Sequence, residues 1–308
     1  MHGVLVIDKP RGPTSHDVVA RVRRALGTRA VGHAGTLDPM ATGVLVVAVG
    51  EATKLVRWLT EDAKSYRATV ALGAETDTLD AEGRLVEQAP IPAELTLERA
   101  RAVVSERFVG AIMQRPPAFS AIKVGGRPLH ERARRGEAVE VPEREVTVHR
   151  LEVLSLEGGA LELSMDVSKG FYVRSLARDL ARALETRGHL SALRRTRSGA
   201  FELAGALDGG RVWAAAGGDE VAREEVRAAL IAPGAACAGM TRVVLDAVGV
   251  ANARHGRPIA APDAAPLEQA PNAAPLEQPI ALFDEGGRLV AIGERRGSSI
   301  QVVRGLRD

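Results

Sequence analysis

The feature that most constrains the fold is an uninterrupted apolar run, VLVVAVG, at residues 44–50. A run of aliphatic, largely β-branched residues is typical of a strand that is buried on both faces. We therefore expect this segment near the centre of a sheet. Apolar runs or regular alternation predict further strands over residues 3–10, 65–73 and 161–167.

Helical patterns separate these strands, over residues 14–27, 52–59, 96–110 and 171–188. Thr14 or Ser15 can cap the first helix and Gly27 can end it, while Gly188 is expected to end the last. The last helix is clearly amphipathic. Its apolar stripe is Val173, Leu176, Ala177, Leu180 and Leu184, and another face carries Arg174, Arg178 and Arg182.

The C-terminal part has the pattern of a small β-rich module, with short strands expected over 241–248, 279–285, 287–296 and 299–306. A shift to Ala and Gly around 205–240 indicates a boundary, which divides the chain into domains 1–238 and 241–308. The hexapeptide AAPLEQ occurs twice within a Pro/Ala-rich run, residues 260–279, which we interpret as a loop.

Charge is informative through its distribution, because the net charge of the 308 residues is only +2. Arginine-rich clusters occupy residues 1–30 and 169–197, and planar guanidinium groups suit contacts with phosphate. The single cysteine, Cys237, excludes an internal disulfide, and the histidines lack the spacing of a metal site. The start lacks a signal-peptide pattern and no apolar run reaches membrane-span length, so we expect a cytoplasmic protein without a membrane partner.

The loop before the apolar strand, GHAGTLDPMATG at residues 32–43, surrounds one carboxylate, Asp38, with glycines. A surface turn explains the Asp-Pro pair, since Pro39 holds Asp38 extended. A reactive carboxylate is the other interpretation. It is favoured by the rigid strand that follows, by Pro39, and by Thr36 and Thr42, whose hydroxyls can bond the loop to itself.

A lone carboxylate can act as a nucleophile or a base if a cation orients it. Arg174 is the candidate, because a cation in the first turn of a helix opposes the helix dipole. A solvated surface arginine is the alternative. Tyr66 and Tyr172 are the only tyrosines, and each can serve either as a platform for a nucleobase or as an ordinary boundary residue.

Five ordered motifs over about 200 residues resemble those of the TruB family of tRNA pseudouridine synthases. Besides the Asp38 loop, they are DKPRGPTSHDVV, KSYRATVALGAETDTLDAEG, PPAFSAIKVGGRPLHERARRG, and the pair GFYVRSLARDL and HLSALRRTRSGAF. The resemblance implies an α+β fold, with a mixed, mostly antiparallel sheet, flanking helices and a small PUA-like domain. It also implies a monomer that needs no cofactor.

The activity that the resemblance implies is conversion of uridine 55 in the T loop of tRNA to pseudouridine, with the target base flipped out of its stack. Asp38 would be the catalytic carboxylate, Arg174 its ion-pair partner, and Tyr66 the ring stacked on the base. His33, Tyr172 and Leu193 would line the nucleotide pocket. Lys9 and the segment 115–145 would contact the RNA.

Several alternatives remain open at the level of sequence. Asp38 can attack C1′ of the ribose, remove the C2′ proton, or add to C6 of uracil. A nucleoside hydrolase or glycosylase would use Asp38 against water and release free uracil. An RNA chaperone would bind tRNA without needing the carboxylate, and this role can coexist with catalysis.

Overall fold

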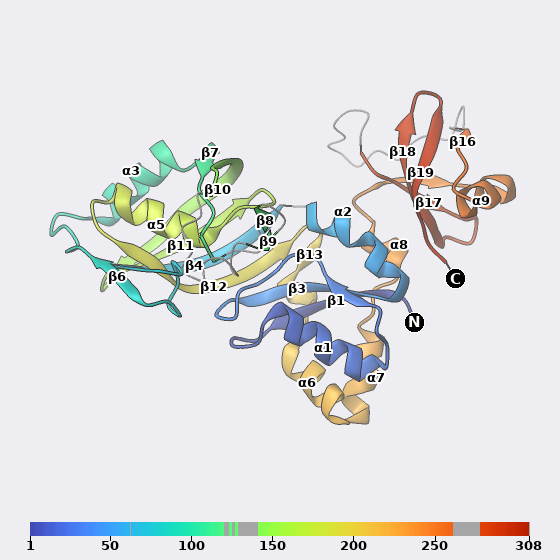
Figure 1. Cartoon of the computed structure of the whole chain (residues 1–308), viewed down its shortest axis with the longest axis horizontal. Coiled ribbons are helices and arrows are strands. Elements are labelled where there is room, and N and C mark those ends of the chain that lie inside the picture. The colour runs from blue at the N-terminus through green and yellow to red at the C-terminus, as the bar shows by residue number, and fades with distance from the viewer. Residues whose placement is uncertain (62, 120–122, 125–126, 129–140, 261–277, 308) are drawn as a thin grey trace.

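The computed structural model describes residues 1–61, 63–119, 123–124, 127–128, 141–260 and 278–307 (Figure 1). Much of the predicted excursion 115–145 lies outside these residues. So does nearly all of the Pro/Ala-rich loop 260–279, including the first AAPLEQ copy and all but the last residue of the second.

One large sheet forms the body of the protein, in the order β14-β1-β3-β12-β4-β11-β10-β7, with β2 added to β3 and β13 to β12. Its strands are β1 (Gly3–Lys9), β2 (Val31–His33), β3 (Thr42–Val49), β4 (Lys64–Leu72), β7 (Gly110–Gln114), β10 (Arg144–Glu157), β11 (Ala160–Val167), β12 (Gly188–Ser198), β13 (Phe201–Glu202) and β14 (Leu207–Asp208). The pairings β1–β14 and β12–β3 are parallel and the other pairings of this sheet are antiparallel. The prediction of a mixed, mostly antiparallel sheet is confirmed.

The apolar run at 44–50 forms the interior strand β3, and every residue from Val44 to Val49 has no exposed surface. β3 meets β12 through only two residue pairs, Arg194 with Thr42 and Arg195 with Gly43. The two halves of the sheet are therefore joined by a short parallel contact, and the Asp38 loop enters the sheet at this junction.

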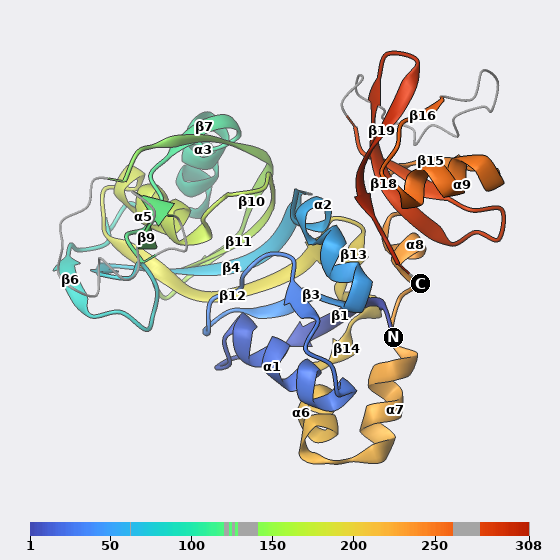
Figure 2. The same ribbon diagram turned by 45° about the vertical axis from the view of Figure 1, so that its right-hand side comes forward.

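Helices cover the two halves separately (Figures 1 and 2). They are α1 (Ser15–Leu26), α6 (Gly209–Gly217) and α7 (Glu220–Ala228) beside β1 and β3, and α3 (Leu97–Arg107) and α5 (Val173–Ala183) within the curve of β4, β11 and β10. Thr14 caps α1 in a capping box with Asp17, and Gly27 ends it at φ 63°. Both groups of helices contribute to one hydrophobic core.

Two predicted helices differ from the structure. The helix expected over 52–59 is a 3₁₀ turn (Gly50–Leu55) that continues into α2 (Val56–Glu61). α5 ends at Ala183, because Glu185 turns into the left-handed region at φ 62°, so Gly188 opens β12 instead. Gly188 is needed there for close packing, since a Cβ would lie 2.6 Å from the Ala181 methyl group.

Much of the Ala- and Gly-rich stretch 205–240 is helical, and α6 and α7 belong to the main core. Their buried residues are Val212, Ala215, Ala216, Ala222 and Val226. A short helix, α8 (Pro233–Ala236), then leads to the second sheet. Small side chains let these helices pack closely, which explains the composition. The division into domains 1–238 and 241–308 stays a prediction.

The second sheet has the order β15-β17-β18-β19-β16. Its strands are β15 (Thr241–Val244), β16 (Ile259–Ala260), β17 (Ile280–Phe283), β18 (Leu289–Arg296) and β19 (Ser299–Gly305), with α9 (Ala247–Arg254) beside them. A hydrophobic cluster joins Val46 and Trp58 to Phe283 and Ile292, so the two sheets share packed side chains.

Two small antiparallel strand pairs lie outside these sheets, β5 (Ala74–Thr76) with β6 (Leu85–Gln88), and β8 (Lys123–Val124) with β9 (Arg127–Pro128). Among the described residues, no helix has both the length and the apolar character that crossing a membrane requires.

Candidate active site

Asp38 lies on the loop between β2 and β3, and neighbouring segments hold this loop from several sides. Ser15 exchanges two hydrogen bonds with Leu37: its hydroxyl donates to the carbonyl at 3.0 Å and accepts from the amide at 2.8 Å. On the other side, Arg195 donates to the carbonyls of Gly35 and Thr36. The direction of the Asp38 side chain is therefore fixed by tertiary contacts.

Thr36 and Thr42 were expected to bond the loop to itself through their hydroxyls, and this prediction is wrong. The Thr36 side chain is exposed, and only its carbonyl takes part by accepting from Arg195. The Thr42 hydroxyl donates to the carbonyl of Leu193 and accepts from Arg194, so it fastens the loop to β12. The loop does not bond to itself through these hydroxyls, and it is held instead by Ser15 of α1 on one side and by β12 on the other.

Lys9 is also placed differently from the prediction. Its side chain is fully buried, and its ammonium group donates to the carbonyls of Pro10, Pro13 and Pro39. Burial lowers the pKa of Lys9 to about 8, while the nearby Asp38 and Glu82 act in the opposite direction. Lys9 thus supports the residue that follows Asp38, and it has no exposed surface with which to contact RNA.

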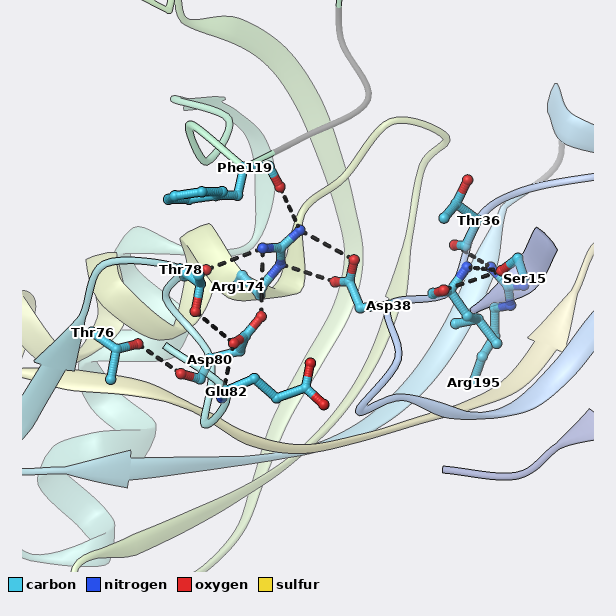
Figure 3. Close-up of polar contacts among 11 residues, drawn as sticks. Ser15, Thr36, Asp38, Thr76, Thr78, Asp80, Glu82, Phe119, Arg174 and Arg195 are labelled. Carbon is cyan, nitrogen blue, oxygen red and sulfur yellow. Dashed lines mark hydrogen bonds and ion pairs between the residues drawn. The ribbon is translucent and has the colours of Figure 1, made fainter. Parts of the chain in front are cut away.

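Arg174 and Asp38 form a bidentate ion pair (Figure 3). Nε of Arg174 lies 2.9 Å from one carboxylate oxygen of Asp38, and Nη2 donates to the other at 3.2 Å. Two further N–H groups of Arg174 donate to the carbonyls of Thr78, at 3.1 Å, and Phe119, at 3.0 Å. This planar arrangement requires a guanidinium group and orients both carboxylate oxygens.

A second carboxylate, Asp80, shares Arg174, and the sequence analysis did not identify it. Asp80 is 5 % exposed, and its Oδ2 lies 3.5 Å from Nη1 of Arg174. Its other oxygen accepts from the Thr78 hydroxyl and the Glu82 amide. The TDTLD turn, in which Leu79 has φ 62°, aims Asp80 at the guanidinium. The turn carries two aspartates, Asp77 and Asp80, and only the folded structure shows that Asp80 is the buried one.

The ion pair lies in a cleft with a volume of about 1060 Å³, and four of the predicted site residues line it with Asp38: Tyr66, Tyr172, Arg174 and Leu193. Tyr66 comes from β4, Tyr172 precedes α5, and Leu193 comes from β12. A cleft of this size accepts a nucleotide, and its walls offer aromatic and aliphatic surfaces for a base. Arg57, Arg144 and Lys169 supply cationic groups along it.

His33 does not line this cleft. Its ring packs at right angles against His16, which does line it, with the ring centroids 5.2 Å apart. Burial lowers the pKa of His33, and His16 and Arg195 lower it further. The structure therefore places the His33 ring outside the cleft lining, where it packs against His16.

Asp38 itself retains 32 % exposure of its side chain at the floor of the cleft. Burial on the remaining sides raises the pKa of Asp38, and the nearby Asp80 raises it further, whereas Arg174 and Lys9 lower it. The site thus holds an oriented carboxylate that is less well solvated than a surface aspartate. Such a group can act as a nucleophile or a base towards a bound sugar or ring.

Comparison with known proteins relates this chain to pseudouridine synthases. A family model described as TruB family pseudouridylate synthase (N terminal domain) matches residues 23–173. The tRNA pseudouridine synthase B of Thermobifida fusca is 45% identical over 298 residues, covering 91% of this chain and 98% of the relative. That of Mycobacterium tuberculosis (strain H37Rv) is 50% identical over 205 residues, covering 65% of this chain and 68% of the relative.

Solved structures agree with the sequence relatives. A chain in the crystal structure of the archaeal box H/ACA sRNP Nop10–Cbf5 complex aligns with a TM-score of 0.72 at 27% identity, covering 98% of this chain and 85% of that one. A chain of an H/ACA RNP bound to a substrate RNA containing 2′-deoxyuridine gives 0.71 at 27% identity, covering 99% and 85%. Fold and site together define a pseudouridine synthase, an isomerase. The chain belongs to the TruB family of these enzymes.

Proposed function

We propose that this enzyme converts uridine 55 in the T loop of tRNA to pseudouridine, with Asp38 as its catalytic carboxylate. The observation that carries the proposal is the bidentate ion pair of Asp38 with Arg174 at the floor of a nucleotide-sized cleft. The name of the relatives, tRNA pseudouridine synthase B, supports tRNA as the substrate. The reaction is an isomerisation that loses no atoms, so it requires neither a redox cofactor nor an external energy source.

The balance of the reaction is simple. The N1–C1′ bond of the target uridine breaks, the uracil turns, and C5 bonds to C1′; the proton leaves C5 and N1 gains one. A base inside a folded loop is stacked, so it must first leave its stack at a cost of about a few kcal/mol. Stacking on Tyr66 and contact with Leu193 would offset this cost, which stacking platforms can do by about 1–3 kcal/mol per base.

Asp38 has three chemical options once the nucleotide is bound. It can attack C1′, remove the proton from C2′, or add to C6 of the uracil ring. In each case the carboxylate must be ionised, and Arg174 holds it in one orientation. The apolar surfaces of Tyr66 and Leu193 in the cleft would keep water away from the detached uracil. This exclusion of water favours isomerisation over hydrolysis.

The position of modification can be mapped directly. Full-length tRNA treated with the enzyme should give one new reverse-transcription stop after carbodiimide treatment, immediately 3′ of position 55. A transcript in which uridine 55 is replaced by cytidine should give none, whereas replacement of a neighbouring T-loop uridine should leave the stop. A stop at another uridine would contradict the proposed position, and release of free uracil would instead indicate a glycosylase.

The pH dependence of turnover should reflect the environment of Asp38. Burial and Asp80 raise the pKa of Asp38 above its ordinary value of 3.8, while Arg174 and Lys9 oppose this shift. The reactive carboxylate is lost as the pH falls through this raised pKa, so activity should decline on the acid side, with a midpoint above pH 3.8. A profile of kcat/KM that stays flat to below this value would contradict the role of Asp38.

A further inference from the structure

Gln114, the last residue of β7, makes an unusual pair of contacts with the start of α5. Its side chain is 1 % exposed and lies outside the cleft lining. Oε1 of Gln114 accepts from the backbone amide of Tyr172 at 2.8 Å, and Nε2 donates to the Tyr172 carbonyl at 3.0 Å. One side-chain amide thus binds both backbone groups of the residue that caps α5.

This contact matters because α5 has no side-chain cap of its own. Tyr172 is its N-cap residue, and its side chain makes no capping hydrogen bond. Helix starts without such bonds fray unless another group binds them. The Tyr172 carbonyl also accepts the intrahelical bond from Leu176 at 3.1 Å, so Gln114 occupies its second lone pair.

The junction between the end of β7 and the start of α5 is also close in the chain to Phe119, which makes a second contact with Arg174. The chain runs five residues from Gln114 to Phe119, whose carbonyl accepts from Nη2 of Arg174. The Ser175 hydroxyl donates to the carbonyl of Arg115 at 2.7 Å and closes the junction further. The contacts form a ring: Gln114 holds Tyr172, the helix carries Arg174, and Arg174 binds Phe119.

We propose that Gln114 is a positioning residue for catalysis, which fixes the start of α5 and thereby the geometry of Arg174 on Asp38. This inference rests on the proposed role of Asp38. Gln114 acts through the backbone, because it touches neither carboxylate. Its effect should therefore appear in the chemical step and in the ionisation of Asp38, with little effect on RNA affinity.

The test is Gln114→Met, which keeps the length of the side chain and removes both hydrogen bonds. We expect kcat on a T-arm stem-loop to fall by about 10- to 100-fold, because small displacements of catalytic groups have effects of this size. KM should change by less than about threefold. The acid limb of the pH–rate profile should move to higher pH, because a less firmly held Arg174 lowers the pKa of Asp38 less. Asp80 would continue to raise this pKa, and Lys9 would continue to lower it.

Thr186→Val is the matched control. Thr186 lies just beyond the other end of α5, is fully buried, and donates to the Ala89 carbonyl at 3.1 Å. The substitution should lower the midpoint of thermal unfolding, because a buried hydrogen bond is lost. It should leave kcat and the acid limb of the pH–rate profile unchanged. If Gln114→Met does not fold, Ser175→Ala loosens the same junction more gently and should move the acid limb in the same direction.

The inference would be overturned if a folded Gln114→Met or Ser175→Ala variant had the same kcat and the same acid limb as the wild type. Equal changes in Thr186→Val would also overturn it, because a general loss of stability would then explain the effect. Both results leave the proposed function intact as long as Asp38→Asn is inactive. Turnover by Asp38→Asn would refute the proposed function itself.

Discussion

Asp38→Asn should abolish the release of tritium from a T-arm stem-loop that carries C5-labelled uridine at position 55. We expect a fall of at least about 10⁴-fold, since an amide can serve neither as the nucleophile nor as the base. Folding should survive, because the change preserves shape and Arg174 keeps the carbonyls of Thr78 and Phe119 and the carboxylate of Asp80. Affinity for the stem-loop should change by only a few-fold.

Asp166→Asn is the matched control for this substitution. Asp166 is also a paired carboxylate, bound by Arg150, Arg197 and the Ser65 hydroxyl, but it lies on β11 and does not line the cleft. Its loss should leave tritium release within about twofold of wild type, because surface ion pairs contribute little. Equal release by Asp38→Asn and wild type would refute the catalytic assignment. An Asp38→Asn enzyme that no longer releases tritium but still promotes tRNA folding would separate a chaperone role from catalysis.

The sequence predicted those parts of the fold that depend on local pattern. The apolar run at 44–50 could only be an interior strand, and Thr14 and Gly27 mark the ends of α1 through backbone geometry that is local. The order of the strands depends on contacts between distant segments, such as Thr42 with Arg194. Periodicity contains no information on these contacts, so the mixed sheet came from the family resemblance alone.

The candidate site was predictable to the extent that its residues occur in recognisable motifs. Asp38 and Arg174 were expected as partners, and the structure brings them together although they are 136 residues apart. Asp80 and Gln114 were missed because their importance arises from what they touch after folding. A buried glutamine at the end of a strand has no distinctive local pattern, and only its contact with Tyr172 reveals it.

The expectation for Lys9 differs from its place in the structure for a physical reason. Lys9 was expected to contact RNA through its side chain. The chain folds back over Lys9, so three carbonyls surround its ammonium group. Sequence reasoning assigns such donors to solvent or ligand, whereas a tightly folded loop uses them to satisfy its own backbone.

Arg174→Lys should lower kcat by about 10²- to 10³-fold, the loss that follows when one preorganised donor is removed from a catalytic site. Lysine keeps the positive charge, but its single ammonium group cannot bind both oxygens of Asp38 and also reach Thr78 and Phe119. Binding of the stem-loop should change little, because Arg174 is 6 % exposed and its donors face protein groups. Single-turnover rates at saturating enzyme measure the chemical step separately from affinity.

Arg182→Lys provides the comparison that makes this result specific. Arg182 lies two turns further along α5 and binds Glu75 in the same side-on manner, with Nε at 3.1 Å and Nη2 at 2.8 Å, but its side chain is 49% exposed. The two variants exchange the same residue types in the same helix, so a fall in the single-turnover rate confined to Arg174→Lys must come from the pairing with Asp38. If Arg174→Lys instead lost affinity while bound RNA turned over normally, Arg174 would be a phosphate contact, and the carboxylate would need another group to orient it.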